Sequence, residues 1–170
     1  MPEGLRSIGT EPRVYILLAL LLLVLPIRWL VAAVLAAAFH EGCHMAAVYL
    51  LGGRCEGIRL SAQGARMEAT LPAFRGELLA VLAGPAGSLL LLSLYRVLPR
   101  VAVCAAVQGF YNLLPIEPLD GGRALRLCLE HWCPHRAEKI MTLVRFAILG
   151  GIVAAAYGIS YCNSGGFGVQ

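Results

Sequence analysis

The stretch AAAFHEGCHMAAVYLL, from Ala36 to Leu51, sets a group of polar and reactive side chains into an otherwise apolar segment. The group consists of His40, Glu41, Cys43 and His44. An ionisable side chain at the centre of a membrane helix costs about 2.5–3.5 kcal/mol even on the lenient insertion scale. Side chains kept at that cost are expected to serve a function, so this stretch decides how the rest of the chain is interpreted.

The composition predicts an integral membrane protein. The chain has 170 residues, of which 59% are hydrophobic and 14% charged, whereas a soluble domain carries about 25% charged residues. A chain of this length is expected to form a single membrane-embedded domain over residues 1–170. The net charge of +4 is modest, and the sequence has no basic run with interleaved aromatic residues, which excludes nucleic acid as an expected partner.

Apolar runs predict an all-α polytopic fold with about five transmembrane helices, because about 20 apolar residues span a bilayer. The runs cover residues 14–25, 29–51, 76–98, 101–114 and 140–159. The first run is short, so it is expected to form either a half-span or one arm of a tight hairpin with the second.

Between the second and third runs the periodicity changes from helical to alternating. Ile58 and Leu60 alternate with polar residues, and Met67, Ala69 and Leu71 do the same after a turn at 62–64. Alternation with a period of two is typical of a strand with one apolar face. The segment 56–71 is therefore predicted to form a small β-hairpin.

The distribution of lysine and arginine predicts the orientation in the membrane. With five spans, ten of these residues fall on the side that carries the N-terminus and the hairpin, and three fall on the other side. The N-terminus and the hairpin are therefore expected in the cytoplasm. The second span then runs inward, and His44 lies in its cytoplasmic half.

HEGCH at 40–44 has the pattern HExxH, which is typical of zinc sites. Histidines at i and i+4 share one helix face, so His40 and His44 can reach the same ion. Glu41 is adjacent and can take a proton from a water whose pKa zinc lowers to about 7. The alternative is a pair of buried histidines that bond to neighbouring backbone or side chains.

A catalytic zinc needs a third protein ligand. The acids in or near the other spans are Glu77, Glu117 and Asp120. Asp120 lies in PIEPLDGGR, where prolines and glycines predict irregular backbone that lines a protein cavity. The fourth run points inward like the second, so its end and His44 share the cytoplasmic side. The alternative role for Asp120 is a turn or helix-cap residue before two glycines.

HEGCH at 40–44, together with NLLPIEPLDGG at 112–122, resembles the site-2 protease (M50) family of intramembrane zinc metalloproteases. The second motif matches N-x-x-P-x-x-x-L-D-G, and it follows the first by about eighty residues with one span between them. The resemblance covers residues 29–127, which correspond to the three-span catalytic core. It is strongest to the small bacterial branch that includes the sporulation protease acting on a sigma-factor precursor.

The resemblance implies that His40, His44 and Asp120 ligate Zn²⁺ and that Glu41 is the general base. It also implies that Asn112 lies near the substrate and stabilises developing negative charge, the alternative being an amide that bonds between helices. The family often has GPxxN in the intermediate span. The corresponding segment here begins with Gly84 and Pro85 but has Ser88 where the motif has asparagine.

These observations predict a zinc metalloendopeptidase of the bacterial cell membrane that cleaves a membrane protein substrate in or near a transmembrane segment. The alternative from another class is a non-catalytic membrane scaffold that binds membrane clients. A different membrane HExxH protease is disfavoured because such enzymes typically take glutamate as third ligand. A second zinc site at Cys128, His131, Cys133 and His135 is also disfavoured, because its spacing does not match paired C-x₂₋₄-C and H-x₃₋₅-H motifs.

Overall fold

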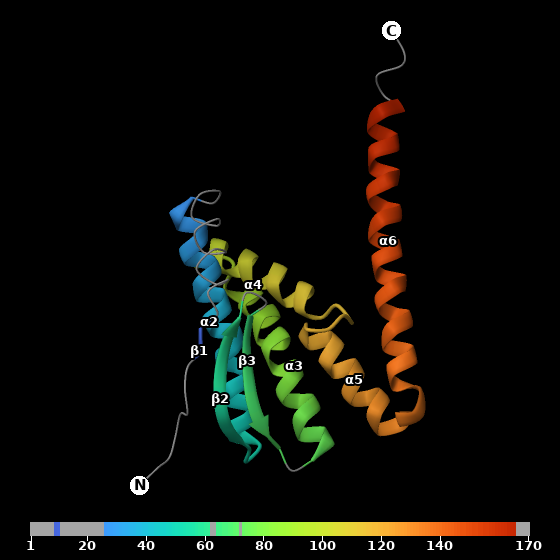
Figure 1. The fold of residues 1–170 in the computed structure, drawn as a ribbon. Coiled ribbons are helices and arrows are strands. Elements are labelled where there is room, and N and C mark those ends of the chain that lie inside the picture. The colour runs from blue at the N-terminus through green and yellow to red at the C-terminus, as the bar shows by residue number, and fades with distance from the viewer. Residues whose placement is uncertain (1–8, 11–25, 62–63, 72, 166–170) are drawn as a thin grey trace.

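The computed structural model describes residues 9–10, 26–61, 64–71 and 73–165 (Figure 1). Three helices in these ranges are long and apolar enough to cross a membrane. They are α2 (Ile27–Leu50), the run Phe74–Leu94 formed by α3 (Phe74–Leu90) and η1 (Leu91–Leu94), and the run Pro134–Cys162 formed by η2 (Pro134–Arg136) and α6 (Ala137–Gly165). An α-helical membrane protein is thus supported, with three of the five predicted spans.

The two remaining predicted spans are not supported by the described residues. The run 14–25 lies outside them. The fourth run corresponds to α4 (Pro99–Asn112), which has 14 residues and a length of about 21 Å at 1.5 Å per residue. The hydrocarbon core of a bilayer is about 30 Å thick, so α4 is too short to cross it unaided. The helix is short because Pro99 begins it and irregular backbone around Pro115 follows it.

The helices α2, α3 and α4 contact one another, and α5 (Asp120–Trp132) contacts α3. These helices form a body from which α6 stands apart (Figure 1). Ala36 of α2 and Ala105 of α4 form a buried cluster with Leu91 of η1, and both alanines are fully inaccessible. Small side chains let helix backbones approach closely in a membrane, where packing rather than water exclusion drives association.

Two glycines end α2 with a defined cap. Gly52 has a φ of +74°, which L side chains rarely adopt. Its N–H donates to the carbonyl of Tyr49 at 3.1 Å, and the N–H of Gly53 donates to the carbonyl of Val48 at 2.8 Å. This is the Schellman pattern, which satisfies the last carbonyls of the helix and turns the chain toward the strands.

A small sheet follows α2. Strands β2 (Arg54–Ser61) and β3 (Gly64–Thr70) are antiparallel, with Ile58 opposite Met67. They coincide with the segment in which alternation predicts a hairpin. The two-residue strand β1 (Gly9–Thr10) adds to β2 in parallel, which gives the order β1-β2-β3. The side of the membrane on which the sheet lies stays a prediction.

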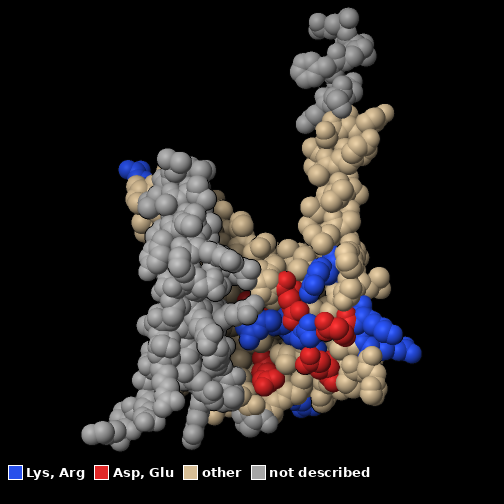
Figure 2. Space-filling view, viewed as in Figure 1, with Lys and Arg blue, Asp and Glu red and all other residues tan. Residues whose placement is uncertain are grey.

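Contact between α6 and the body is confined to its first turns. Ala137 and Met141 are buried there, whereas all residues from Leu149 to Cys162 are exposed. Figure 2 shows that charged side chains gather where α6 leaves the body, and that the part of the helix beyond them is free of charge. This distribution fits a helix whose far portion lies in lipid.

Candidate active site

His40 and His44 lie one helical turn apart on the buried face of α2. Their residues are 2% and 7% exposed, and the ring centroids are 4.8 Å apart. The i, i+4 spacing therefore brings both imidazoles together, as the HExxH pattern predicts.

Asp120, in the first turn of α5, completes a cluster with both imidazoles. Its Oδ2 lies 3.1 Å from Nε2 of His40 and 3.2 Å from Nε2 of His44. The two nitrogens are 3.2 Å apart. Glu77 and Glu117, the other acids considered from the sequence, line a cavity that His44 and Asp120 also line. Among the described side chains, however, Asp120 is the carboxylate that contacts the histidines.

Gly121 and Gly122 let α5 begin close to the preceding loop. A Cβ on Gly121 would lie 2.2 Å from the carbonyl oxygen of Leu113, and one on Gly122 would lie 2.3 Å from the carbonyl carbon of Ile116. Because these neighbours are backbone atoms, they cannot rotate away as a side chain would. The LDGG sequence thus brings Asp120 to the histidines through an approach that only glycine permits.

The hydrogen bonds of His44 fix its tautomer. Nδ1 lies 2.7 Å from the carbonyl oxygen of Ala80, and a carbonyl only accepts, so Nδ1 carries the proton. Neutral His44 then has a lone pair on Nε2, which faces the carboxylate oxygen of Asp120 at 3.2 Å. Two acceptors at this distance require a cation between or beside them, either a proton or a metal ion.

The three facing atoms fit zinc. A tetrahedral zinc with bonds of about 2.0–2.1 Å has neighbouring ligand atoms about 3.3–3.4 Å apart. The three separations in this cluster are 3.1, 3.2 and 3.2 Å. Two imidazoles and one carboxylate are also a donor set that zinc accepts. Among the described residues, His40, His44 and Asp120 form the group of histidine, cysteine or acidic side chains that could hold a metal ion.

The pKa of the Asp120 carboxyl favours its ionised form. Burial opposes ionisation, but the imidazoles of His40 and His44 outweigh it when they present a proton on Nε2 to the carboxylate, and they then lower the pKa to about 2. The carboxyl is therefore ionised at neutral pH, which is the form that ligates a metal ion.

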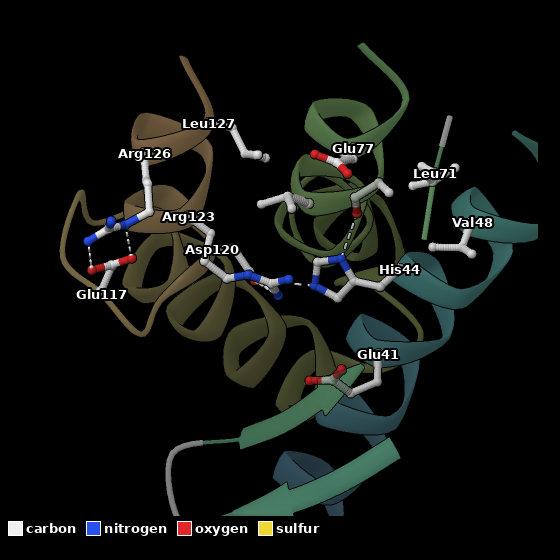
Figure 3. Close-up of a pocket in the computed structure, with 12 residues that line it drawn as sticks. Glu41, His44, Val48, Leu71, Glu77, Glu117, Asp120, Arg123, Arg126 and Leu127 are labelled. Carbon is white, nitrogen blue, oxygen red and sulfur yellow. Dashed lines mark hydrogen bonds and ion pairs between the residues drawn. The ribbon is translucent and has the colours of Figure 1, made fainter. Parts of the chain in front are cut away.

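Glu41 shares a cavity of about 310 Å³ with His44 and Asp120 (Figure 3). It lies on α2 beside the histidines but is not part of the cluster that could hold an ion. This arrangement suits a general base that would take a proton from a water at the ion without binding the ion itself.

Two arginines of α5 line the same cavity, and neither was identified from the sequence. Arg123 Nη1 lies 4.0 Å from Oδ1 of Asp120. Arg126 contacts both carboxylate oxygens of Glu117, at 2.5 and 2.8 Å, which Figure 3 shows as two dashed lines. The sequence could have indicated Arg123 by its spacing from Asp120, because residues three apart in a helix share a face.

Asn112 does not join this group. Its Nδ2 donates to the carbonyl of Gln108 in its own helix at 3.1 Å, and it is not among the residues that line the cavity. The structure therefore does not bring Asn112 to the histidines, although the family motif suggested a place near the substrate. A position at the end of α4 does not fix which way its side chain points, so the motif alone could not reveal this.

The second group of cysteines and histidines does not form a metal cluster among the described residues. The ring of His131 instead stacks on Phe74, with centroids 4.2 Å apart and planes within 6°. Cys128 and Cys133 are free thiols.

A family model described as Peptidase M50B-like matches residues 14–113. Among solved structures, the fold is similar to that of the site-2 protease from Methanocaldococcus jannaschii, with a TM-score of 0.63 and 22% sequence identity. This similarity covers 91% of the present chain and 84% of that one. No curated protein matches the sequence. Because the family model matches more than half of the residues, the chain belongs to the Peptidase M50B-like family, the family of site-2 proteases.

Proposed function

We propose that this protein is an intramembrane zinc metalloendopeptidase that hydrolyses a peptide bond in or near a transmembrane segment of another membrane protein. The observation that carries the proposal is the buried group of His40, His44 and Asp120, whose ligand atoms converge on one point beside Glu41. Membership in a metalloprotease family supports the same function.

Each residue of the group has a role in this proposal. His40 and His44 would hold the ion through Nε2, and Asp120 would hold it through Oδ2. When bound, zinc would supply a Lewis acid that lowers the pKa of a water and polarises a carbonyl. Glu41 takes the proton from the attacking water and delivers it to the leaving amine. The Ala80 carbonyl keeps the proton of His44 on Nδ1 and so leaves Nε2 free to bind the ion.

Glu41→Gln is the variant that tests the proposal, because it removes the base and leaves the three ligands in place. Purified wild-type protein and the variant should bind the same amount of zinc. Peptides in the membrane fraction of cells that express the wild type should include cleavage products that are missing with the variant. Glu130→Gln, on an exposed part of α5, is the matched control and should cleave like the wild type.

Equal processing of membrane proteins by the wild type and Glu41→Gln would contradict the protease proposal. It would favour a scaffold that keeps the fold and binds membrane clients. Wild-type protein without zinc after purification in zinc-containing buffer would contradict the metal site itself.

We also propose that the N-terminus and the active-site side face the cytoplasm, as the lysine and arginine distribution predicts. Cys133 and Cys162 test this orientation because both are exposed free thiols that lie near opposite ends of α6. In single-cysteine variants, an impermeant maleimide added to whole cells should label Cys162 and spare Cys133. The reverse pattern would overturn the orientation.

A further inference from the structure

Ser88 is a fully buried polar side chain next to the metal cluster. It lies on α3 with no exposed surface, and its Oγ is 2.8 Å from Nδ1 of His40. The opposite helix closes the site, since a Cβ on Gly109 of α4 would lie 3.1 Å from the Cβ of Ser88. The hydroxyl is thus held against the far side of the imidazole from Asp120.

The contact can act on His40 in one of two ways, because a hydroxyl both donates and accepts. If Oγ donates to Nδ1, the proton of neutral His40 lies on Nε2 and the ring cannot ligate through that atom. If Oγ accepts from Nδ1, the lone pair of Nε2 faces Asp120 and His44. Since Nε2 is the His40 atom in the cluster, metal binding requires the second arrangement.

We propose that Ser88 is a positioning residue for the metal site: its Oγ accepts the Nδ1 proton of His40 and holds the ring so that Nε2 faces the ion. The inference rests on the zinc site proposed above. It gives the two histidines different supports, with a backbone carbonyl at His44 and a side-chain hydroxyl at His40. The support at His40 can therefore be removed by substitution.

Ser88→Ala removes the acceptor and changes the volume by little. Without Oγ, the buried Nδ1 proton has lost its partner, so the tautomer needed for binding is disfavoured. Loss of such a partner typically weakens metal affinity by about 10–100-fold. Ser93→Ala is the matched control, because Ser93 lies a short way along the same run of helix, is exposed and bonds only to the local carbonyl of Leu90 among the contacts described.

Ser88→Cys separates hydrogen bonding from packing. Sulfur is larger than oxygen and is a weak acceptor. A hydrogen-bonding role predicts that the zinc affinity of the Cys variant lies between those of wild type and Ser88→Ala. A packing role predicts the opposite order, because the larger atom disturbs a closed site more than a missing oxygen does.

The experiment measures the zinc dissociation constant of each purified protein by competition with a chromophoric chelator, with the helix content checked by circular dichroism. We expect Ser88→Ala to raise this constant by about 10–100-fold and Ser93→Ala to leave it within about twofold. Equal affinity of Ser88→Ala and Ser93→Ala, or weaker binding by Ser88→Cys than by Ser88→Ala, would overturn the role of Ser88.

Cleavage by the wild type and Glu41→Gln in the same preparations distinguishes the two proposals. If zinc affinity falls in Ser88→Ala while the wild type and Glu41→Gln process membrane proteins equally, Ser88 positions a metal that serves another function. If the wild type binds no zinc, the role of Ser88 is overturned together with the metal site.

Discussion

The apolar stretches of α3 and α6 look alike in sequence but differ in the structure. In an apolar stretch of 18 residues, 33% is buried in the run formed by α3 and η1, whereas 6% is buried in the run that contains α6. Both contain glycines, yet those of α3 lie against side chains, whereas Gly150, Gly151 and Gly158 of α6 lie in open space. Apolarity therefore identifies membrane helices, and the surroundings of their small residues distinguish the helix that builds a site from the helix that borders lipid.

The strongest test of this difference is Gly84→Ala on α3. A Cβ at this position would lie 2.2 Å from Nε2 of His44, so the methyl group would displace a ligand atom of the proposed site. We expect zinc binding to be lost and the unfolding free energy to fall by about 1–3 kcal/mol from overpacking. Zinc content after dialysis and thermal unfolding in detergent measure both effects. Normal zinc content in the variant would show that His44 does not need this space.

Gly87→Ala is expected to have a smaller effect on the site, because the side chain that it displaces is Cys43 and not a proposed zinc ligand. The added Cβ would lie 2.2 Å from Sγ of Cys43, which leads us to expect a loss of about 1–3 kcal/mol in unfolding free energy. Cys43→Ala removes the obstacle, so the double variant should recover most of the loss. A double-mutant cycle measures this coupling, and additive losses would mean that the two positions do not interact.

The ionic contacts that join α6 to α5 and to Glu117 are expected to matter less. Arg126 on α5 reaches Glu117 and also Glu138 at the start of α6, at 3.1 Å, while Arg145 of α6 lies 3.8 Å from Glu117. Carboxylates around the Arg126 guanidinium raise its pKa, with Glu117 the main cause. These contacts are partly exposed, so Arg126→Ala should cost about 1 kcal/mol or less.

The more informative result of Arg126→Ala is the position of α6. Spin labels on Val34 of α2 and Gly158 of α6, both exposed, should give a broader distance distribution in the variant than in the wild type. Arg136→Ala, at a neighbouring charge of η2, is the control. An unchanged distribution would mean that apolar contacts at Ala137 and Met141 suffice to hold the helix.

Gly150→Ala and Gly151→Ala on α6 complete the series with the smallest effect. Apart from the adjacent residues and the backbone of α6 itself, no described atom lies within 4 Å of a Cβ at either position. We expect unchanged zinc binding and a change in unfolding free energy of about 1 kcal/mol at most, since alanine is the better helix former. A large loss of stability would show that another chain or segment covers this face of α6.

The sequence predicted those parts of the site that depend on spacing within a helix or on a rare residue type. His40 and His44 are held together by the helical repeat, and Asp120 was one of few acids near membrane depth. The contact between Ser88 and His40 was not predictable, because it depends on how closely α3 approaches α2. The sequence could not reveal that the Asn112 amide bonds within its own helix, because a position at the end of α4 does not fix which way the side chain points.

The fold was predictable to a similar extent. Apolar runs located α2, α3, α4 and α6, and alternation located the strands of the hairpin, but no apolar run predicted α5. The fourth apolar run, 101–114, was counted as a span, whereas the helix that forms there, α4, has 14 residues and is too short to cross a bilayer unaided. The separation of α6 from the body was not predictable, since lipid and protein surroundings select equally apolar residues.

The hydrogen bond from His44 to the carbonyl of Ala80 has a consequence for genetics. Every amino acid has that carbonyl, so no side-chain substitution at position 80 can delete it. An alanine scan is therefore expected to detect Ser88 as the support of one histidine and to pass over Ala80 as the support of the other. Half of what orients the two imidazoles is thus supplied by the backbone of α3.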